Sequence, residues 1–285
     1  HTPFGHAGER FLNELLHAET GRYFNHNVQS VRVLDNLFER NISLQTLDGV
    51  LCHNGEFEQQ EYRPAYGKTF AEFDKSMLDC CEKGGDAISK LVPAPLEGSV
   101  VRICDMIAYL GKDRQDARVA KIIPRDYKFQ SEFIGAENAA IINNLTVDII
   151  ENSYGKDYIL LSPGAYDDLK RAKEENYSVI YKNEQINRQY NEIIRPMFAE
   201  LYYKLLDEVK SGSEGRIIYR HHIKFIVEAQ KYYKHGDYLA ENPNLIVADF
   251  IASMTDDYFI ALHEKLFPGS KYKIKYKSYF SEDNA

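Results

Sequence analysis

Apolar residues recur at helical spacing along most of the chain. Near the N-terminus, Leu12, Leu15 and Leu16 share one helix face, as apolar residues three or four positions apart do. The longest stripe contains Ile193, Ile194, Met197, Phe198, Leu201, Tyr202 and Leu205. The stretches 138–150 and 245–266 show the same spacing. The pattern predicts an all-α, mainly helical fold in which these stripes form the core.

Only the segment from Lys271 to Lys277 alternates between basic and other residues. It fits a charged edge strand or a solvated tail, because lysines discourage unwanted strand pairing. It also fits a basic and aromatic patch that touches a phosphate-bearing effector. We therefore expect at most a short hairpin or edge strand near the C-terminus. We divide the chain into a core over residues 1–150 and a helical C-terminal subregion over 151–285 that packs on it.

Composition narrows the class of protein. The 285 residues carry a formal net charge of −8, which argues against a general nucleic-acid-binding surface. The four cysteines form no CxxC pair, a usage typical of a reduced, cytoplasmic protein. No run of 18 apolar residues is present, so the sequence predicts no membrane-spanning helix.

Two short segments bring histidines together with a carboxylate. The chain opens His1-Thr2-Pro3-Phe4-Gly5-His6-Ala7-Gly8-Glu9, and its Pro and Gly predict a tight turn before a helix that begins near His6. His6 and Glu9 are three residues apart and share a helix face. From spacing alone, a general acid–base pair and a structural His with a capping carboxylate are equally good interpretations. In Tyr23–Arg32, His26 is expected at a helix start where Asn27 favours a capping turn.

A third segment places three polar residues on one helix. Asp105, Tyr109 and Asp113 recur at i, i+4 and i+8, so they follow one line along the helix surface. Apolar neighbours predict that this helix is strongly buried, namely Val100, Ile103, Cys104, Ile107 and Ala108. A buried Asp105 needs a partner, and both a salt bridge and a metal ion satisfy that need. Arg114 and Asp116, further along, are expected on a solvated face.

Together these segments resemble the dGTP triphosphohydrolase-like branch of the HD superfamily. The residues that carry the resemblance are His-Thr-Pro-Phe-Gly-His-Ala-Gly-Glu at 1–9, His-Asn-Val-Gln-Ser at 26–30, Leu-Asp-Gly-Val-Leu-Cys-His at 47–53, Asp-Met-Ile-Ala-Tyr at 105–109 and Asp-Phe-Ile-Ala-Ser-Met-Thr-Asp at 249–256. They extend from residue 1 to about residue 267, with Ser253 in place of the usual Gly. The resemblance implies an HD-domain fold and hydrolysis of deoxynucleoside triphosphates to deoxynucleoside and triphosphate.

The resemblance also implies a site. His6, Glu9 and His26 would form the catalytic cluster. Asp105 would be the last ligand of a divalent metal (Mn, Mg, Fe, Co or Ni), which polarises a phosphate oxygen as a Lewis acid. The other ligands, a His and a His-Asp pair, are expected upstream of His1, so the numbered chain by itself is expected to bind the metal poorly or not at all.

Substrate recognition and partners follow from the same resemblance. Tyr109 would pack against the deoxyribose, and Asp113 would accept a hydrogen bond from the 3′-hydroxyl. His1 and Arg32 are counted with the substrate-binding residues, although an Arg on a helix also fits a surface or salt-bridged position. A homo-oligomer is expected. The basic group around Arg216 to Lys224 fits either a phosphate or nucleotide-effector site or a charged helix face.

Two alternatives stay open. One is an HD phosphohydrolase with another nucleotide specificity, and the other is a nucleotide-binding regulatory protein without catalysis. The line of Asp105, Tyr109 and Asp113 favours the triphosphohydrolase. The chain contains no GxxxxGK[ST] loop and no GxSxG elbow, which excludes a P-loop NTPase and leaves nucleophilic serine chemistry without support.

Overall fold

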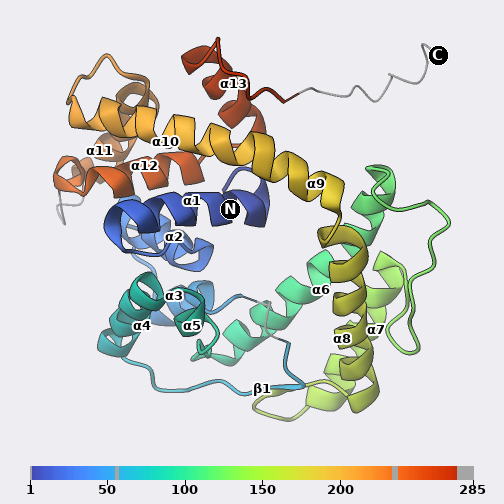
Figure 1. Ribbon diagram of the computed structural model, residues 1–285. Coiled ribbons are helices and arrows are strands. Elements are labelled where there is room, and N and C mark those ends of the chain that lie inside the picture. The colour runs from blue at the N-terminus through green and yellow to red at the C-terminus, as the bar shows by residue number, and fades with distance from the viewer. Residues whose placement is uncertain (1, 55–57, 233–236, 275–285) are drawn as a thin grey trace, which may run out of the picture. The chain divides into compact units, whose positions relative to one another are not determined.

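The computed structural model describes residues 2–54, 58–232 and 237–274, and these residues are mainly α-helical (Figure 1). The prediction of an all-α fold is confirmed. The helices are α1 (Gly5–Thr20), α2 (His26–Arg32), α3 (Leu44–Leu51), α4 (Phe70–Lys83), α5 (Gly85–Ile88), α6 (Leu96–Val119), α7 (Asn138–Ser153), α8 (Pro163–Asn176), α9 (Glu184–Gln189), α10 (Arg195–Lys210), α11 (Lys224–Ala229), α12 (Pro243–Ala252) and α13 (Asp256–Leu266).

Shorter elements connect or extend these helices. Four are π-helical turns, η1 (Val33–Leu37), η2 (Tyr177–Tyr181), η3 (Tyr190–Ile194) and η4 (Tyr219–Ile223), and two are 3₁₀ turns, η5 (Gln230–Tyr232) and η6 (Tyr238–Ala240). Two strands, β1 (Glu61–Tyr62) and β2 (Ile159–Leu160), pair antiparallel, with Glu61 opposite Leu160 and Tyr62 opposite Ile159.

The chain divides into two compact units. The first contains residues 1–26 and 188–285, and the second contains residues 27–187. The N-terminal helix therefore belongs with the C-terminal half of the sequence. The division at residue 150 expected from the sequence stays a prediction.

In the first unit, α1 packs on α10 and α12, and the three helices lie side by side in Figure 1. The long apolar stripe predicted from the sequence is the core of this unit, with Phe198, Leu201 and Tyr202 fully buried. Phe11 of α1 contacts Phe198, with their ring centroids 5.8 Å apart. The core thus anchors α1 through its apolar face and leaves the opposite face for polar residues.

The C-terminal region differs from the sequence-based expectation in two ways. Residues 245–266 form two helices, because Thr255 is extended and caps α13 by accepting a hydrogen bond from the Tyr258 backbone N–H. Residues 271–274 form no strand, so the edge-strand interpretation is wrong there, and residues 275–277 lie outside the described residues. The two strands of the described chain lie instead at 61–62 and 159–160, segments too short to alternate recognisably.

In the second unit, α6 is the central helix and packs on α3, α7 and α8. Its inner face places Ile103, Met106 and Leu110 against Ile141 and Leu145 of α7. Gly111 permits this approach, because a Cβ there would lie 2.5 Å from the Asn138 Cα. A second cluster joins α3 and α4 through residues that include Leu47, Leu51, Phe73 and Cys80.

A buried carboxylate fixes the loop that precedes α7. Asp168 of α8 is 1% exposed, and its Oδ2 accepts hydrogen bonds from the Ser131 hydroxyl and from the backbone N–H groups of residues 132–134, at 2.8–3.0 Å. Burial alone would raise the pKa of Asp168, but these donors outweigh it and lower the pKa from 3.8 to about 2.

We expect Asp168→Asn to destabilise the protein by about 2 kcal/mol at neutral pH, because an amide is a weaker acceptor than a carboxylate for these buried donors. The folded pKa of Asp168 lies below its unfolded value, so its contribution is complete above pH 4 and is lost as the pH falls toward 2. Urea unfolding at pH 7 and pH 3 measures both effects. A variant that loses as much stability between these pH values as the wild type would contradict the assignment.

None of the helices within the described ranges combines the length and the apolar character needed to cross a bilayer.

Candidate functional site

The start of α1 is a strained turn held by a distant residue. Phe4 has φ 60° and Gly5 has φ 55°, and the left-handed region is unfavourable for a side chain as large as that of Phe4. The Phe4 backbone N–H donates a 2.8 Å hydrogen bond to Asp256 Oδ1 of α13. The Thr2 hydroxyl closes the turn by donating to the Gly5 carbonyl at 2.9 Å. Asp256 therefore stabilises the unusual conformation from which α1 begins.

Packing fixes the same turn from inside. The Phe4 ring lies edge-on against Phe259, with centroids 5.4 Å apart, and also contacts Phe198. At Gly8, an added Cβ would lie 1.8 Å from the Pro3 carbonyl oxygen and 2.9 Å from Cζ of Phe198. Only a glycine fits at Gly8, so the first turn of α1, which carries His6 and leads directly into Glu9, is held in one position.

The structure brings Glu9, His26 and His6 together within the first unit. The Nδ1 atom of His26 lies 2.9 Å from Oε1 and 3.0 Å from Oε2 of Glu9, and the His26 backbone N–H donates to the same Oε1 at 2.8 Å. The rings of His6 and His26 have centroids 6.1 Å apart. Their side chains differ in setting, since His26 is 11% exposed and His6 lies on the surface.

Electrostatics keep Glu9 ionised. Burial raises its pKa, but the hydrogen bonds and charge of His26, with a smaller contribution from His6, more than compensate and leave the pKa below 4.5. With Glu9 ionised, this short contact requires a proton on Nδ1 of His26. The arrangement suits general acid–base chemistry, in which a carboxylate orients an imidazole and stabilises its protonated form.

The residues around His26 agree only in part with the sequence-based predictions. His26 begins α2, as expected, but Asn27 does not cap the helix. It is fully buried, and its amide donates to the Leu51 carbonyl at 3.0 Å, which ties α2 to the end of α3. Arg32 is the half-buried last residue of α2, and His1 lies outside the described residues.

Asp105, Tyr109 and Asp113 follow one another along α6 in the second unit. The expectation that Asp105 is buried is wrong: it is exposed, together with Val100, Val101, Cys104 and Ala108. The helix buries only one side, because its inner positions are Ile103, Met106, Ile107 and Leu110. Tyr109 and Asp113 are half-buried. About 12 Å of helix separates Asp105 from Asp113 at 1.5 Å per residue.

Asp113 has a partner that no sequence pattern predicts. The Tyr181 hydroxyl donates a hydrogen bond to Asp113 Oδ2. Burial, followed by this hydrogen bond and by the charge of Asp113, raises the pKa of Tyr181. Tyr181 lies 68 positions away and ends the π-helical turn η2, so no local motif marks it. The pair places a phenol and a carboxylate beside Tyr109.

Arg114 contradicts its expected place on a solvated face. It is fully buried, and it donates to Asn176 Oδ1 at 2.8 Å and to the carbonyls of Ala136 and Ala172. Its guanidinium lies 4.0 Å from the centre of the Phe129 ring. The loop between α6 and α7 folds back over Arg114, which charge patterning along α6 alone could not reveal. Asp116 is exposed, as expected.

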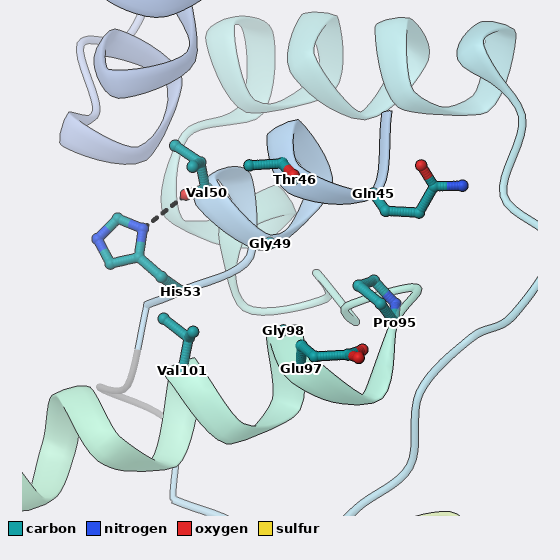
Figure 2. A pocket seen from close by; sticks show the side chains of 9 residues that line it. All are labelled: Gln45, Thr46, Gly49, Val50, His53, Pro95, Glu97, Gly98 and Val101. Atoms are coloured by element: carbon teal, nitrogen blue, oxygen red, sulfur yellow. Dashed lines mark hydrogen bonds between the residues drawn. The ribbon is translucent and has the colours of Figure 1, made fainter. Parts of the chain in front are cut away.

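A cavity of about 640 Å³ opens between α3 and the first turns of α6. Figure 2 shows Gln45, Thr46 and Val50 on α3 and Val101 on α6, with His53 at one end of the opening. Apolar groups form most of its wall, and the His53 Nδ1–H donates to the Val50 carbonyl at 2.6 Å. Because Val101 lies one turn before Asp105 on α6, the cavity borders the exposed face that carries Asp105.

A metal ion needs several His, Cys, Asp or Glu side chains close together. Among the described residues, no group of three or more His, Cys, Asp or Glu side chains could hold a metal ion. Asp105 is accessible on α6, but a single carboxylate does not make a divalent-metal site. By themselves, the described residues do not fit the metal that the resemblance implies.

The basic group of the first unit is less basic than its sequence indicates. Arg216, Arg220 and Lys224 are exposed, but the hollow of about 330 Å³ beside them is also lined by Glu214 and Glu228. His222 is buried with its Nε2 2.8 Å from the Tyr238 hydroxyl, which donates to Asp249 at 3.0 Å. These contacts favour a solvated helix face over a phosphate site.

Comparison with known proteins adds independent information. No protein-family model matches the chain. Curated relatives do: the chain is 26% identical over 276 residues to a deoxyguanosinetriphosphate triphosphohydrolase-like protein of Desulfatibacillum aliphaticivorans, covering 94% of the chain and 67% of the relative. It is 27% identical over 273 residues to the protein of that name in Caldanaerobacter subterraneus subsp. tengcongensis, covering 94% of the chain and 64% of the relative. A Rickettsia prowazekii protein of that name is 23% identical over 302 residues.

The structure defines a mainly helical protein in which Glu9 contacts His26 and the ring of His6 lies nearby. The sequence comparisons narrow this class, and the expected resemblance is confirmed. The chain is a relative of the deoxyguanosinetriphosphate triphosphohydrolase-like proteins, and it spans about two thirds of the length of the first two relatives.

Proposed function

We propose that this protein hydrolyses deoxynucleoside triphosphates, with dGTP as the type substrate, to deoxynucleoside and triphosphate. The contact between Glu9 and His26, with His6 beside them, carries the proposal. The relatives named as triphosphohydrolase-like proteins support it, since they match the chain over 94% of its length.

The reaction needs two proton movements. A water oxygen forms a bond to the α-phosphorus, the bond from that phosphorus to the 5′-oxygen breaks, and the leaving oxygen takes up a proton. Two imidazoles whose centres lie 6.1 Å apart can divide these tasks, one accepting a proton from water and the other supplying one. Ionised Glu9 stabilises the imidazolium form of His26, whether His26 accepts the proton from water or supplies one to the leaving oxygen.

Sugar recognition is assigned to α6. In this proposal the Tyr109 ring packs against C2′ of the deoxyribose, where a ribose hydroxyl has no room. Asp113 accepts a hydrogen bond from the 3′-hydroxyl, and Tyr181 holds the Asp113 carboxylate in place by donating a hydrogen bond to it. Arg32 and His1 remain candidates for contacts to the phosphates. Dependence on a divalent metal, with Asp105 as one ligand, is a further part of the proposal that rests on the resemblance.

Triphosphate release from each dNTP, from the matching ribonucleotides and from 2′,3′-dideoxynucleotides, measured with full-length protein and Mn²⁺, tests the proposal. We expect dNTPs to exceed ribonucleotides in kcat/KM. Asp113→Asn should reduce kcat/KM for dNTPs about 10- to 100-fold, because a weakened hydrogen bond to the 3′-hydroxyl costs about 1.4–2.7 kcal/mol.

Dideoxynucleotides provide the matched control, since they lack the hydroxyl that Asp113 is proposed to bind. Their hydrolysis should change little in Asp113→Asn. An equal loss of kcat/KM on dNTPs and on dideoxynucleotides would contradict the proposed role of Asp113 in sugar recognition. Turnover of ribonucleotides as fast as dNTPs would contradict the assignment of Tyr109.

A further inference from the structure

The cavity between α3 and the first turns of α6 has no role in the proposed reaction. Its volume of about 640 Å³ lies within the range of about 300–1,000 Å³ that small-molecule sites usually have. Its wall is mostly apolar and includes only a few polar groups, which is the usual composition of such sites. The cavity therefore has the size and the lining of a binding site for a small molecule.

Two glycines join the two walls of the cavity. Gly49 of α3 and Gly98 of α6 both line it, and a Cβ added to Gly98 would lie 3.5 Å from the Gly49 Cα. The two helices therefore approach closely at this point. Val50 and Val101 border the space beside the contact, one from each helix (Figure 2).

One buried carboxylate holds the two walls in place. Asp48, next to Gly49 on α3, is fully buried, and its Oδ2 accepts a hydrogen bond from the Ala94 backbone N–H at 2.5 Å. Its Oδ1 accepts a hydrogen bond from Lys68 Nζ, which also donates to the Val92 carbonyl at 3.0 Å. Asp48 and Lys68 thus fix the segment that leads into α6 against α3. The cavity is preformed, as ligand sites usually are.

The charge of the lining selects the kind of ligand. Glu97 is the only Asp, Glu, Lys or Arg among the described residues that line the cavity. It is exposed, and it takes part in no ion pair within the described ranges. Gln45 lies toward the same end of the opening as Glu97, opposite His53 (Figure 2). The carboxylate and the amide carbonyl both accept hydrogen bonds, so this end of the cavity is negative and rich in acceptors.

We propose that the cavity binds a small organic cation, which consists of an apolar body and a protonated amine. The body contacts the apolar wall, and the ammonium group donates charge-assisted hydrogen bonds to Glu97 and a further bond to Gln45. A ligand that carries phosphate fits less well, because its negative charge would lie beside Glu97 without a Lys or Arg among the described lining residues. The proposal concerns binding alone, so it stands independently of the proposed dNTP hydrolysis.

Methyl NMR of the full-length protein with labelled valines, titrated with 2-phenylethylammonium, tests the proposal. The neutral 2-phenylethanol and the anionic phenylacetate are probes of similar shape. We expect the ammonium probe to shift the methyl signals of Val50 and Val101, which border the cavity. It should bind about 10-fold more tightly than the alcohol, because a charge-assisted hydrogen bond is stronger than a neutral one. Phenylacetate should bind most weakly.

Two substitutions of a carboxylate separate the site from general attraction of a cation to a chain with a net charge of −8. Glu97→Gln should lower the affinity for the ammonium probe about 10-fold and leave that for the alcohol unchanged. Asp74→Asn is the matched control, since Asp74 is also exposed and lies on α4 of the same unit. It removes the same charge and should leave both affinities unchanged.

A second pair of variants tests the cavity itself. Val101 is 50% exposed, so the ring of Val101→Trp can enter the cavity without displacing the core, and binding of both the ammonium and the alcohol should be lost. Val119→Trp, at the far end of α6 where Val119 is 71% exposed, should bind both probes like the wild type. If Val101→Trp loses its fold, Glu97→Gln decides the proposal, because its substitution lies on the surface.

Equal affinities for the ammonium and the alcohol would overturn the proposal. So would an unchanged affinity for the ammonium in Glu97→Gln, an equal loss of that affinity in Asp74→Asn, or a titration that leaves the methyl signals of Val50 and Val101 in place. A folded Val101→Trp variant that binds like the wild type would also contradict it.

Discussion

Glu9→Gln is expected to lower kcat for dNTP hydrolysis by on the order of 10³-fold, within the range that general acid–base catalysis supplies. The substitution preserves size and shape but removes the negative charge that His26 Nδ1 contacts at 2.9 Å. A glutamine no longer stabilises the imidazolium, and its amide can bond to Nδ1 as a donor, which selects the wrong tautomer. Because Glu9 acts through His26 in this account, KM should change little.

Steady-state kinetics of triphosphate release provides the measurement, and a residue on the same helix provides the control. Glu14 of α1 forms an exposed ion pair with Arg195 at 2.8 Å, so Glu14→Gln also removes one carboxylate charge from α1. It should retain nearly full activity. If Glu9→Gln keeps wild-type kcat, or if it raises KM while kcat is unchanged, the role assigned to Glu9 is wrong.

Gly8→Ala is expected to have the largest effect on stability, a loss of about 3 kcal/mol or more, because overpacking a rigid contact costs this much. The new methyl group would occupy the position 1.8 Å from the Pro3 carbonyl oxygen, and backbone cannot move aside as a flexible side chain can. The displacement would reach Glu9, the next residue, so activity should fall together with stability.

Chemical denaturation of Gly8→Ala and of a second helical glycine separates this clash from the general effect of alanine. At Gly49 of α3 the nearest atom to an added Cβ is the Gly98 Cα at 3.8 Å, an ordinary contact. Gly49→Ala should be neutral or stabilising by up to about 1 kcal/mol, since alanine favours helix. A Gly8→Ala variant as stable as Gly49→Ala would contradict the packing described for the start of α1.

The spacing of apolar and polar residues predicted the features that depend on short-range sequence patterns. The apolar stripe of α10, the start of α1 near His6 and the alignment of Asp105, Tyr109 and Asp113 on one helix are all consequences of 3.6-residue spacing, and they are present in the structure. The proximity of His6, Glu9 and His26 was expected through the family resemblance rather than through spacing, because 17 positions separate Glu9 from His26.

Long-range contacts were not predictable from the pattern. Asp256 supports Phe4 across 252 positions and Tyr181 binds Asp113 across 68, although Asp256 belongs to a recognised motif that could have drawn attention to it. The burial of Arg114 depends on a loop that folds back over α6, and the exposure of Asp105 on the absence of such a cover within the described residues. Charge and hydropathy along one helix do not report what packs on each side.

The central claim is that water attacks the α-phosphorus of a deoxynucleoside triphosphate. Hydrolysis of dGTP by the full-length protein in ¹⁸O-labelled water, with products followed by ³¹P NMR and mass spectrometry, tests it most directly. The account predicts unlabelled deoxyguanosine and triphosphate with one ¹⁸O on a terminal phosphorus. Release of pyrophosphate or single phosphate, or appearance of the label in deoxyguanosine, would contradict it.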